Sequence, residues 1–321
     1  MRDAQVSLFV VGDPMRNGGV TQGATRQAGT QDVWVHRDSR VPSPENTWVH
    51  EYIHTRQNYS VADEMAWWDE ASAFIGYMNR CHYMLQQGRF VADAVYYYGD
   101  LVPNFVRHKE TDPAGVLPGY DYDVTNTEVI MERMEVEDGR IVLPSGISYR
   151  VLVLPDRDAM RLRVLEKIQN MVEQGLTVVG PKPERTPGLR TYPEGDRKVQ
   201  EIADRLWGIE PDSDVHSYGD GRVIRGRSGR EVLQDMDVAP DFSYEAASPK
   251  AKLDYIHRRT DDADIYYVVN RKDRWTRADC RFRVSDGRPE LWNPATGERK
   301  SCPAYRRGDG STTIPIRLAP Y

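Results

Sequence analysis

The chain has 321 residues, a length that predicts two or three domains rather than one. Its 43 Lys and Arg residues against 49 Asp and Glu residues give a net charge of −6, which argues against a nucleic acid or an anionic membrane as the main partner. The three cysteines are far apart and predict no disulfide framework. We expect no transmembrane segment and no signal peptide, because the apolar runs are too short. Compartment and oligomeric state stay open.

The first part of the chain is predicted to be mainly helical, after a short strand over 6–11. Ser43, followed by a proline and a glutamate, is typical of a helix start, because serine caps, proline fits the first turn and glutamate complements the helix dipole. Apolar residues at three-to-four spacing predict a longer helix over about 61–87. Gly88 is its expected end.

Residues 117–236 alternate between strand and helix patterns. Asp138-Gly139 is a hairpin turn signal. Strand, helix and strand with short joints predict a parallel βαβ arrangement. The stretch 212–230 is expected to be a solvated loop around one short strand. The expected strands cover 149–154, 176–180 and 222–224, and the expected helices cover 158–174 and about 197–207.

From about residue 249 the pattern changes to short strands with turns, which predicts a β-sandwich or part of one. Strands are expected over 265–269, 279–284 and 312–318, and the last of them is expected to lack a closing partner. The predicted fold class is therefore α/β plus β, with a helical N-terminal segment, an α/β layer and a partial β-sandwich. The expected domains are 1–110, 111–245 and 246–321.

His50-Glu51-Tyr52-Ile53-His54 is a candidate metal site. On a helix both imidazoles lie on one face and can reach one metal ion, and Glu51 could act as general base on a metal-bound water. Glu70 is the candidate third ligand. Residues 43–57 resemble the metal-binding helix of gluzincin-type zinc peptidases, and the resemblance covers roughly 6–73. It implies a zinc cofactor and a peptide substrate. The alternative is two polar histidines on an exposed helix face.

A second resemblance begins at Trp67-Trp68-Asp69 and runs through most of the remaining chain. It includes Tyr96-Tyr97-Tyr98-Gly99-Asp100, Gly119-Tyr120-Asp121 and Pro289-Glu290-Leu291-Trp292. In these motifs the chain resembles family-106 glycoside hydrolases, the α-L-rhamnosidases. The resemblance implies a (β/α)8-type catalytic barrel, a flavodoxin-like α/β layer and β-sandwich modules. This chain would then hold the last barrel elements, the α/β layer and the start of a sandwich.

The residues themselves suit a sugar site. Trp67, Trp68 and Tyr97 offer flat apolar faces for a pyranose ring, and Asp93 and Asp100 offer acceptors for its hydroxyl groups. Aromatic residues at such spacing are more often core residues, which is the alternative for each of them. Glycoside hydrolysis usually needs two carboxylates across the scissile bond, and no residue here carries over as that pair.

Three functions stay open on sequence alone. The extent of the second resemblance favours a rhamnosidase-like glycoside hydrolase acting on a carbohydrate. The alternatives are a zinc peptidase with Glu51 as base and His50, His54 and Glu70 as ligands, and a carbohydrate-binding or structural remnant without turnover. The cofactor is zinc if that site is assembled and otherwise none. Both resemblances are partial, which a fusion, a recombined or designed sequence or a gene fragment would explain.

Overall fold

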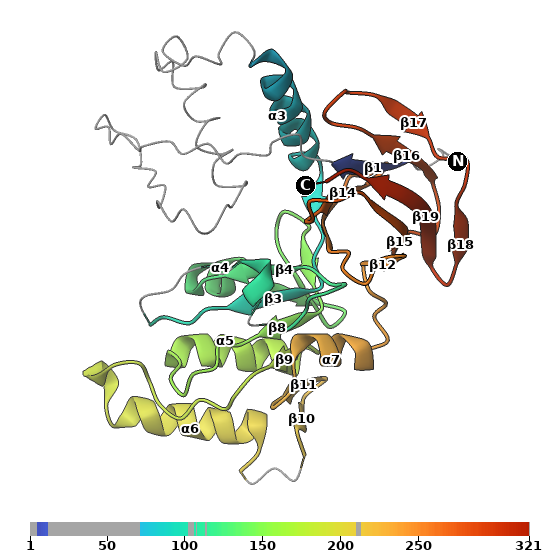
Figure 1. Cartoon of the computed structure of the whole chain (residues 1–321). Coiled ribbons are helices and arrows are strands. Elements are labelled where there is room, and N and C mark those ends of the chain that lie inside the picture. The colour runs from blue at the N-terminus through green and yellow to red at the C-terminus, as the bar shows by residue number, and fades with distance from the viewer. Residues whose placement is uncertain are drawn as a thin grey trace, which may run out of the picture.

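The computed structural model describes residues 5–11, 71–101, 106, 108–112, 114–209 and 213–320. These residues form a mixed α/β protein with several sheets and few helices (Figure 1). We distinguish an α/β unit, built around one sheet within 94–235, from a two-sheet unit, which holds the strands from 242 onward together with two earlier strands. No helix in these ranges has the length and apolar character needed to span a membrane.

The sheet of the α/β unit is parallel except at one edge. Its strand order is β10-β11-β9-β8-β3-β4, and only β10 runs antiparallel to its neighbour. The chain adds β4 on one side of β3 and then adds β8 on the other side, so the strand order reverses beside β3. Open α/β sheets bind ligands outside the carboxyl ends of the strands at such a reversal. The strands are β3 (Ala94–Tyr97), β4 (Tyr122–Thr125), β8 (Val151–Val153), β9 (Thr177–Val179), β10 (Val215–Tyr218) and β11 (Gly221–Ile224).

Apolar residues on both faces of this sheet bury it between helices. Val95 and Tyr97 of β3 belong to a core shared with α4, α5 and α6, whereas Ala94 and Tyr96 belong to a core shared with α7. This alternation follows from the two-residue period of a strand. The helices are α4 (Thr127–Glu132), α5 (Leu162–Glu173), α6 (Glu194–Trp207) and α7 (Gly229–Asp235).

A small three-stranded sheet follows α4 and confirms the predicted hairpin turn. Asp138 and Gly139 both have positive φ angles, 49° and 70°. A two-residue turn that matches the right-handed twist of the flanking strands requires such angles at both central positions. The strands are β5 (Glu135–Glu137), β6 (Arg140–Val142) and β7 (Ser148–Tyr149).

The two-sheet unit consists of a six-stranded and a four-stranded sheet that share one core. The six-stranded order is β17-β16-β1-β14-β13-β2, and the four-stranded order is β12-β15-β19-β18. Tyr266 and Val268 of the first sheet pack with Cys280 and Phe282 of the second. The strands are β1 (Gln5–Val11), β2 (Arg89–Phe90), β12 (Phe242–Ala246), β13 (Leu253–Arg259), β14 (Asp264–Asn270), β15 (Thr276–Phe282), β16 (Arg288–Trp292), β17 (Arg299–Ser301), β18 (Arg306–Gly308) and β19 (Ser311–Leu318).

Early segments complete this unit. The strand expected over 6–11 is confirmed as β1, which lies parallel to both β14 and β16 and joins them. Helix α3 (Ser72–Leu85) covers the outer side of the same sheet, where Tyr77, Met78 and Cys81 pack with Tyr267 and Val269. The described parts of the expected domain 1–110 are thus divided, because β1 and α3 join the two-sheet unit and β3 joins the α/β unit.

Two expectations about the later strands need correction. The strand expected over 312–318 has partners on both sides, since β19 pairs with β15 and β18, so the expected lack of a closing partner is wrong. β15 begins at Thr276 rather than at residue 279, because the alternation of buried and exposed side chains starts there. The division into 1–110, 111–245 and 246–321 remains a prediction, and its second boundary falls inside β12.

Candidate functional site

The carboxyl edge of the parallel sheet gathers polar side chains around Asp100. Asp100 follows β3 through Gly99, whose φ of +81° bends the chain at the end of the strand. An added Cβ at Gly99 would lie 3.3 Å from Cγ of Pro155, which follows β8. The loops after β3 and β8 therefore meet at the strand-order reversal, and Asp100 lies beside that meeting point.

Three donors hold the Asp100 carboxylate. Thr127 donates its hydroxyl to Oδ1 at 2.6 Å, and Tyr97 donates its phenol to Oδ2 at 2.8 Å. Nε of Arg161 forms an ion pair with Oδ2 at 3.2 Å. The Asp100 side chain is only 9% exposed, whereas that of Arg161 is 46% exposed. The cluster is thus a buried carboxylate with a half-exposed guanidinium at its open side.

Tyr97 is held inside this cluster by burial. Its side chain is 1% exposed and belongs to the core of the α/β unit. Burial raises the pKa of the Tyr97 phenol above its ordinary value, and the adjacent Asp100 carboxylate raises it further, whereas the Thr127 hydroxyl lowers it. The phenol therefore stays protonated at neutral pH and serves as a hydrogen-bond donor.

Asp93 lies at the opposite end of β3 from Asp100, so the structure does not bring the two predicted acceptors together. The four residues of β3 separate them by about 13 Å at the usual rise of a strand. Asp93 is 2% exposed. Its carboxylate accepts from Nη2 of Arg283 at 2.9 Å and from Nε of Arg150 at 3.3 Å. Asp93 thereby joins the two units of the protein.

Arg283 leads from Asp93 into a buried network of the two-sheet unit. Its guanidinium also lies 3.4 Å from Asp241, which accepts from Tyr266 at 3.0 Å and lies 3.0 Å from Nδ1 of His257. The other imidazole nitrogen of His257 lies 2.8 Å from Asp264. We call this set the charged joint; it comprises Asp93, Arg150, Asp241, His257, Arg259, Asp264, Tyr266 and Arg283.

The protonation states within the joint follow from its opposite charges. Burial alone lowers the pKa of His257, but the carboxylates of Asp241 and Asp264 outweigh burial and hold that pKa above its ordinary value. Burial raises the pKa of Asp241, but His257 and Arg283 outweigh it and lower that pKa. The opposite charges around them therefore favour the protonated imidazole of His257 and the ionised carboxylate of Asp241.

A second contact between the units is built on Lys109. Its Nζ donates to Asp121 and to the carbonyl oxygen of Tyr255, both at 2.7 Å. Burial raises the pKa of Asp121 to about 6, although Lys109 opposes that rise. Lys109 itself keeps a raised pKa, because Asp121 and Asp254 outweigh its own burial. Lys109 thus adds a second link between the α/β unit and the two-sheet unit, besides the ion pair of Asp93 with Arg283.

The remaining predicted site residues lie outside the described part of the chain. These are the zinc-peptidase set His50, Glu51, His54 and Glu70, and the aromatic pair Trp67 and Trp68. Within the described ranges, no group of three or more His, Cys, Asp or Glu side chains could hold a metal ion. The zinc site assigned to the first set stays a prediction. The sugar contacts assigned to Trp67 and Trp68, and to Asp93, Tyr97 and Asp100, also stay predictions.

Sequence reasoning missed two members of the Asp100 cluster, Thr127 and Arg161. Thr127 is the first residue of α4, with one residue between it and the end of β4, and Arg161 directly precedes α5, which follows β8. A usable signal was present, because the carboxyl ends of parallel strands meet at one edge and the residues that open the following helices lie there. Using this signal to find Thr127 and Arg161 required the strand order, which places β4 and β8 on either side of β3.

Comparison with known proteins supports a carbohydrate-active assignment. The model of glycoside hydrolase family 106, described as alpha-L-rhamnosidase, matches residues 29–307. The chain belongs to this family. The fold of this chain is also similar to that of a solved rhamnosidase from Novosphingobium sp. PP1Y. The two superpose with a TM-score of 0.71 at 34% sequence identity, and the superposition covers 79% of this chain and 24% of the rhamnosidase.

A curated relative gives a second comparison. A protein of Formosa agariphila named "Putative beta-glucuronidase" is 32% identical over 288 residues, covering 84% of this chain and 23% of the relative. The chain thus spans about a quarter of the length of each of these two proteins. None of these comparisons supports the suspected zinc peptidase.

Proposed function

We propose that this chain is part of a rhamnosidase-like glycoside hydrolase that removes terminal α-L-rhamnose from glycans. The family match over residues 29–307 carries the proposal, and the similarity to the Novosphingobium rhamnosidase supports it. The strand order of the parallel sheet further supports equating the α/β unit with a flavodoxin-like layer. The core shared by two sheets supports equating the two-sheet unit with the start of a β-sandwich.

Within this proposal, the carboxyl edge binds sugar hydroxyl groups. An ionised carboxylate offers about four lone-pair sites, and the three donors on Asp100 leave about one for a hydroxyl of a bound sugar. Arg161 keeps further donors on its half-exposed guanidinium. We assign no general acid or base to the described residues, because the Asp100 carboxylate is already held by neighbouring side chains.

The experiment is hydrolysis of 4-nitrophenyl α-L-rhamnopyranoside, with 4-nitrophenyl β-D-glucuronide as the second substrate because of the name of the Formosa relative. We expect release from the rhamnoside to exceed release from the glucuronide by about tenfold or more, and Asp100→Asn to weaken rhamnose binding by about tenfold. Calorimetric titration with L-rhamnose measures binding separately. Binding without release would contradict hydrolysis by this chain and favour a non-catalytic carbohydrate-binding role for it. Absence of both would contradict any rhamnose-directed function.

A further inference from the structure

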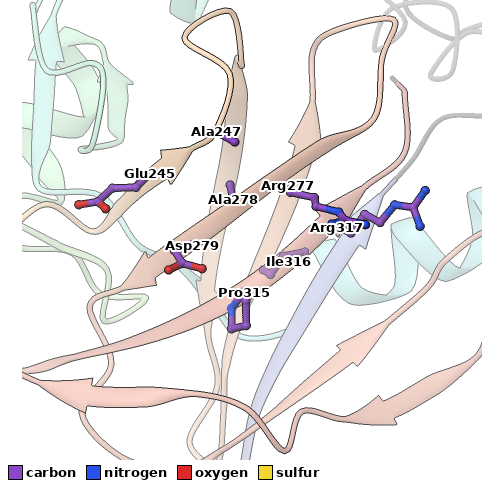
Figure 2. A pocket seen from close by; sticks show the side chains of 8 residues that line it. All are labelled: Glu245, Ala247, Arg277, Ala278, Asp279, Pro315, Ile316 and Arg317. Atoms are coloured by element: carbon purple, nitrogen blue, oxygen red, sulfur yellow. The ribbon is translucent and has the colours of Figure 1, made fainter.

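The outer face of the four-stranded sheet is open and hollowed. The inward side chains of β15, such as Ala278 and Cys280, belong to the shared core, so Arg277 and Asp279 between them point outward. A hollow of about 440 Å³ lies over this face (Figure 2). It is lined by Glu245, Ala247, Arg277, Ala278, Asp279, Pro315, Ile316 and Arg317. Helix α3 covers the other sheet, and no helix in the described ranges takes the equivalent place here.

The charges on this face are arranged in like pairs. Arg277 of β15 lies directly opposite Arg317 of β19, and Asp279 lies opposite Glu245 of β12. Like charges directly opposite each other destabilise an antiparallel pair of strands. Asp279 has a counter-ion in Arg306, 3.1 Å away. Within the described part of the chain, by contrast, neither Arg277 nor Arg317 forms an ion pair. The face therefore has two adjacent cations whose repulsion a bound anion would relieve.

An aromatic ring lies beside the two arginines. Trp275 precedes β15 and is 57% exposed. The guanidinium carbon of Arg317 lies 4.2 Å from the centroid of its ring. This contact orients Arg317 next to the indole and leaves much of the indole in solvent. An exposed indole offers a flat apolar surface of the kind on which a pyranose ring packs.

We propose that this face binds an anionic saccharide, that is, a sugar with a carboxylate or a sulfate. Arg277 and Arg317 bind the anionic group, because planar guanidinium groups form paired hydrogen bonds with such oxyanions. Trp275 packs against the ring, and Glu245 and Asp279 accept hydroxyl hydrogens at the other end of the hollow. Its volume suits a ligand of disaccharide size.

The arrangement selects against other anions. The carboxylates of Glu245 and Asp279 lie on the same face as the arginines, so a polyphosphate or a nucleic acid would meet like charge along its length. A sugar with one anionic group and several hydroxyls matches both ends. This site lies on the two-sheet unit, whereas the Asp100 cluster lies on the α/β unit, so the inference does not depend on the proposed hydrolysis.

The test compares three disaccharides by calorimetric titration of the full chain. The ligands are cellobiouronic acid, cellobiose, and cellobiose with a sulfate at the corresponding carbon. We expect either or both anionic ligands to bind about tenfold or more tightly than cellobiose, with affinity falling as salt is added. The tighter of the two identifies the anionic group as carboxylate or sulfate. Equal binding of cellobiose, or no binding of any of the three, would overturn the proposal.

Variants of one strand supply the matched control. Arg277→Gln is expected to reduce the affinity for the anionic ligand about tenfold, to the level of cellobiose. Arg281→Gln lies on the same face of β15 but outside the hollow, where its Nε donates to Ser311, and is expected to leave binding unchanged. Trp275→Ala should lower the affinity for the anionic ligand and for cellobiose by the same factor. Thermal unfolding confirms that each variant is folded, and an equal loss in Arg277→Gln and Arg281→Gln would overturn the assignment.

Discussion

At the residue scale, His257 shows how the charged joint depends on pH. Because its folded pKa is raised above the ordinary value of 6.5, its contribution to stability is complete below pH 6.5 and is lost as pH rises through the folded pKa. The pKa of Asp241 and that of Asp264 are lowered from 3.8, so their contributions are lost only as pH falls below that value. The joint is therefore most stable between these two limits.

His257→Gln tests this pH dependence. We expect the free energy of unfolding to fall by about 3 kcal/mol near pH 6, because the substitution leaves the buried Asp241 carboxylate and the partly buried Asp264 carboxylate without the imidazolium between them. The loss should shrink as pH rises above the folded pKa of His257, where the wild type has also lost that charge. Urea unfolding at several pH values measures both. His216→Gln is the control, because Nδ1 of His216 lies 2.9 Å from a backbone carbonyl oxygen, that of Leu206, rather than from a carboxylate. An identical pH profile in the two variants would contradict the role of His257.

Gly99 is a second residue-scale case, since it determines where Asp100 lies. An alanine there would have to adopt a φ of +81° and would approach Pro155 Cγ at 3.3 Å. We expect Gly99→Ala to lower the free energy of unfolding by about 1–3 kcal/mol and to weaken rhamnose binding. Gly188→Ala is the matched control, because nothing lies within 4 Å of its added Cβ and it is expected to change stability by less than about 0.5 kcal/mol. A similar effect of both variants would contradict this account.

At the element scale, the like-charge pairs on the four-stranded sheet make a prediction about stability. Replacing Arg277 by Thr removes its repulsion from Arg317 and places a β-branched residue in a strand. We expect the free energy of unfolding to rise by about 0.2–1 kcal/mol. Arg281→Thr should not raise it, because Arg281 lies opposite Thr313 and donates to Ser311. Thermal melts of both variants compare the two, and a loss of stability in Arg277→Thr would show that this arginine has a structural partner.

The elements differ in how well sequence predicted them, for identifiable reasons. The hairpin at Asp138-Gly139 and the helix α6 were predicted because turn chemistry and amphipathic periodicity are local signals. β10 and α7 were missed, since a polar edge strand and a seven-residue helix carry weak periodicity within a charged stretch. β1 was predicted as a strand, but its place between β14 and β16 depends on pairing with distant residues, which no local pattern encodes.

The candidate site divides in the same way. Asp100 and Tyr97 were identified from residue type alone, and they do lie together. Thr127 and Arg161 come from other strand–helix connections, so only the strand order brings them to Asp100. Asp93 and Asp100 were both predicted as acceptors for sugar hydroxyls, whereas the strand between them places them at opposite ends of β3. The ion pairs of Asp93 with Arg283 and Arg150 required the tertiary fold.

At the scale of the whole molecule, the two units are connected through buried charges as well as through backbone hydrogen bonds, such as that from Asp241 N–H to the Gly119 carbonyl oxygen. The three larger core clusters do not merge into one, although Phe90 of β2 packs against the core of the α/β unit. The connections described above are Arg283 between Asp93 and Asp241, and Lys109 between Asp121 and the Tyr255 carbonyl. Buried ion pairs contribute little net stability when complete, but losing one partner is costly. The relative placement of the units should therefore depend on a few side chains.

Arg283→Met tests this dependence. The substitution keeps an apolar side chain in place but leaves the carboxylates of Asp93 and Asp241, which are 3% and 2% exposed, without their shared counter-ion. We expect the free energy of unfolding to fall by about 3–5 kcal/mol. Because the lost contact lies between the units, we also expect their unfolding transitions to separate. Hydrogen exchange followed by mass spectrometry across a urea series measures this, by comparing peptides of β8 and α5 with peptides of β14 and β15.

The matched control for Arg283→Met is Arg306→Met. Like Arg283, Arg306 pairs with an aspartate, in this case Asp279 of β15, but the Arg306 side chain is 78% exposed. Solvent therefore screens the pair, and its loss should change the free energy of unfolding by less than about 1 kcal/mol. The wild type and Arg306→Met should then lose protection in both units at the same urea concentration, whereas Arg283→Met should lose it at two. Coincident transitions in Arg283→Met would mean that apolar contacts, and not the charged joint, couple the α/β unit to the two-sheet unit.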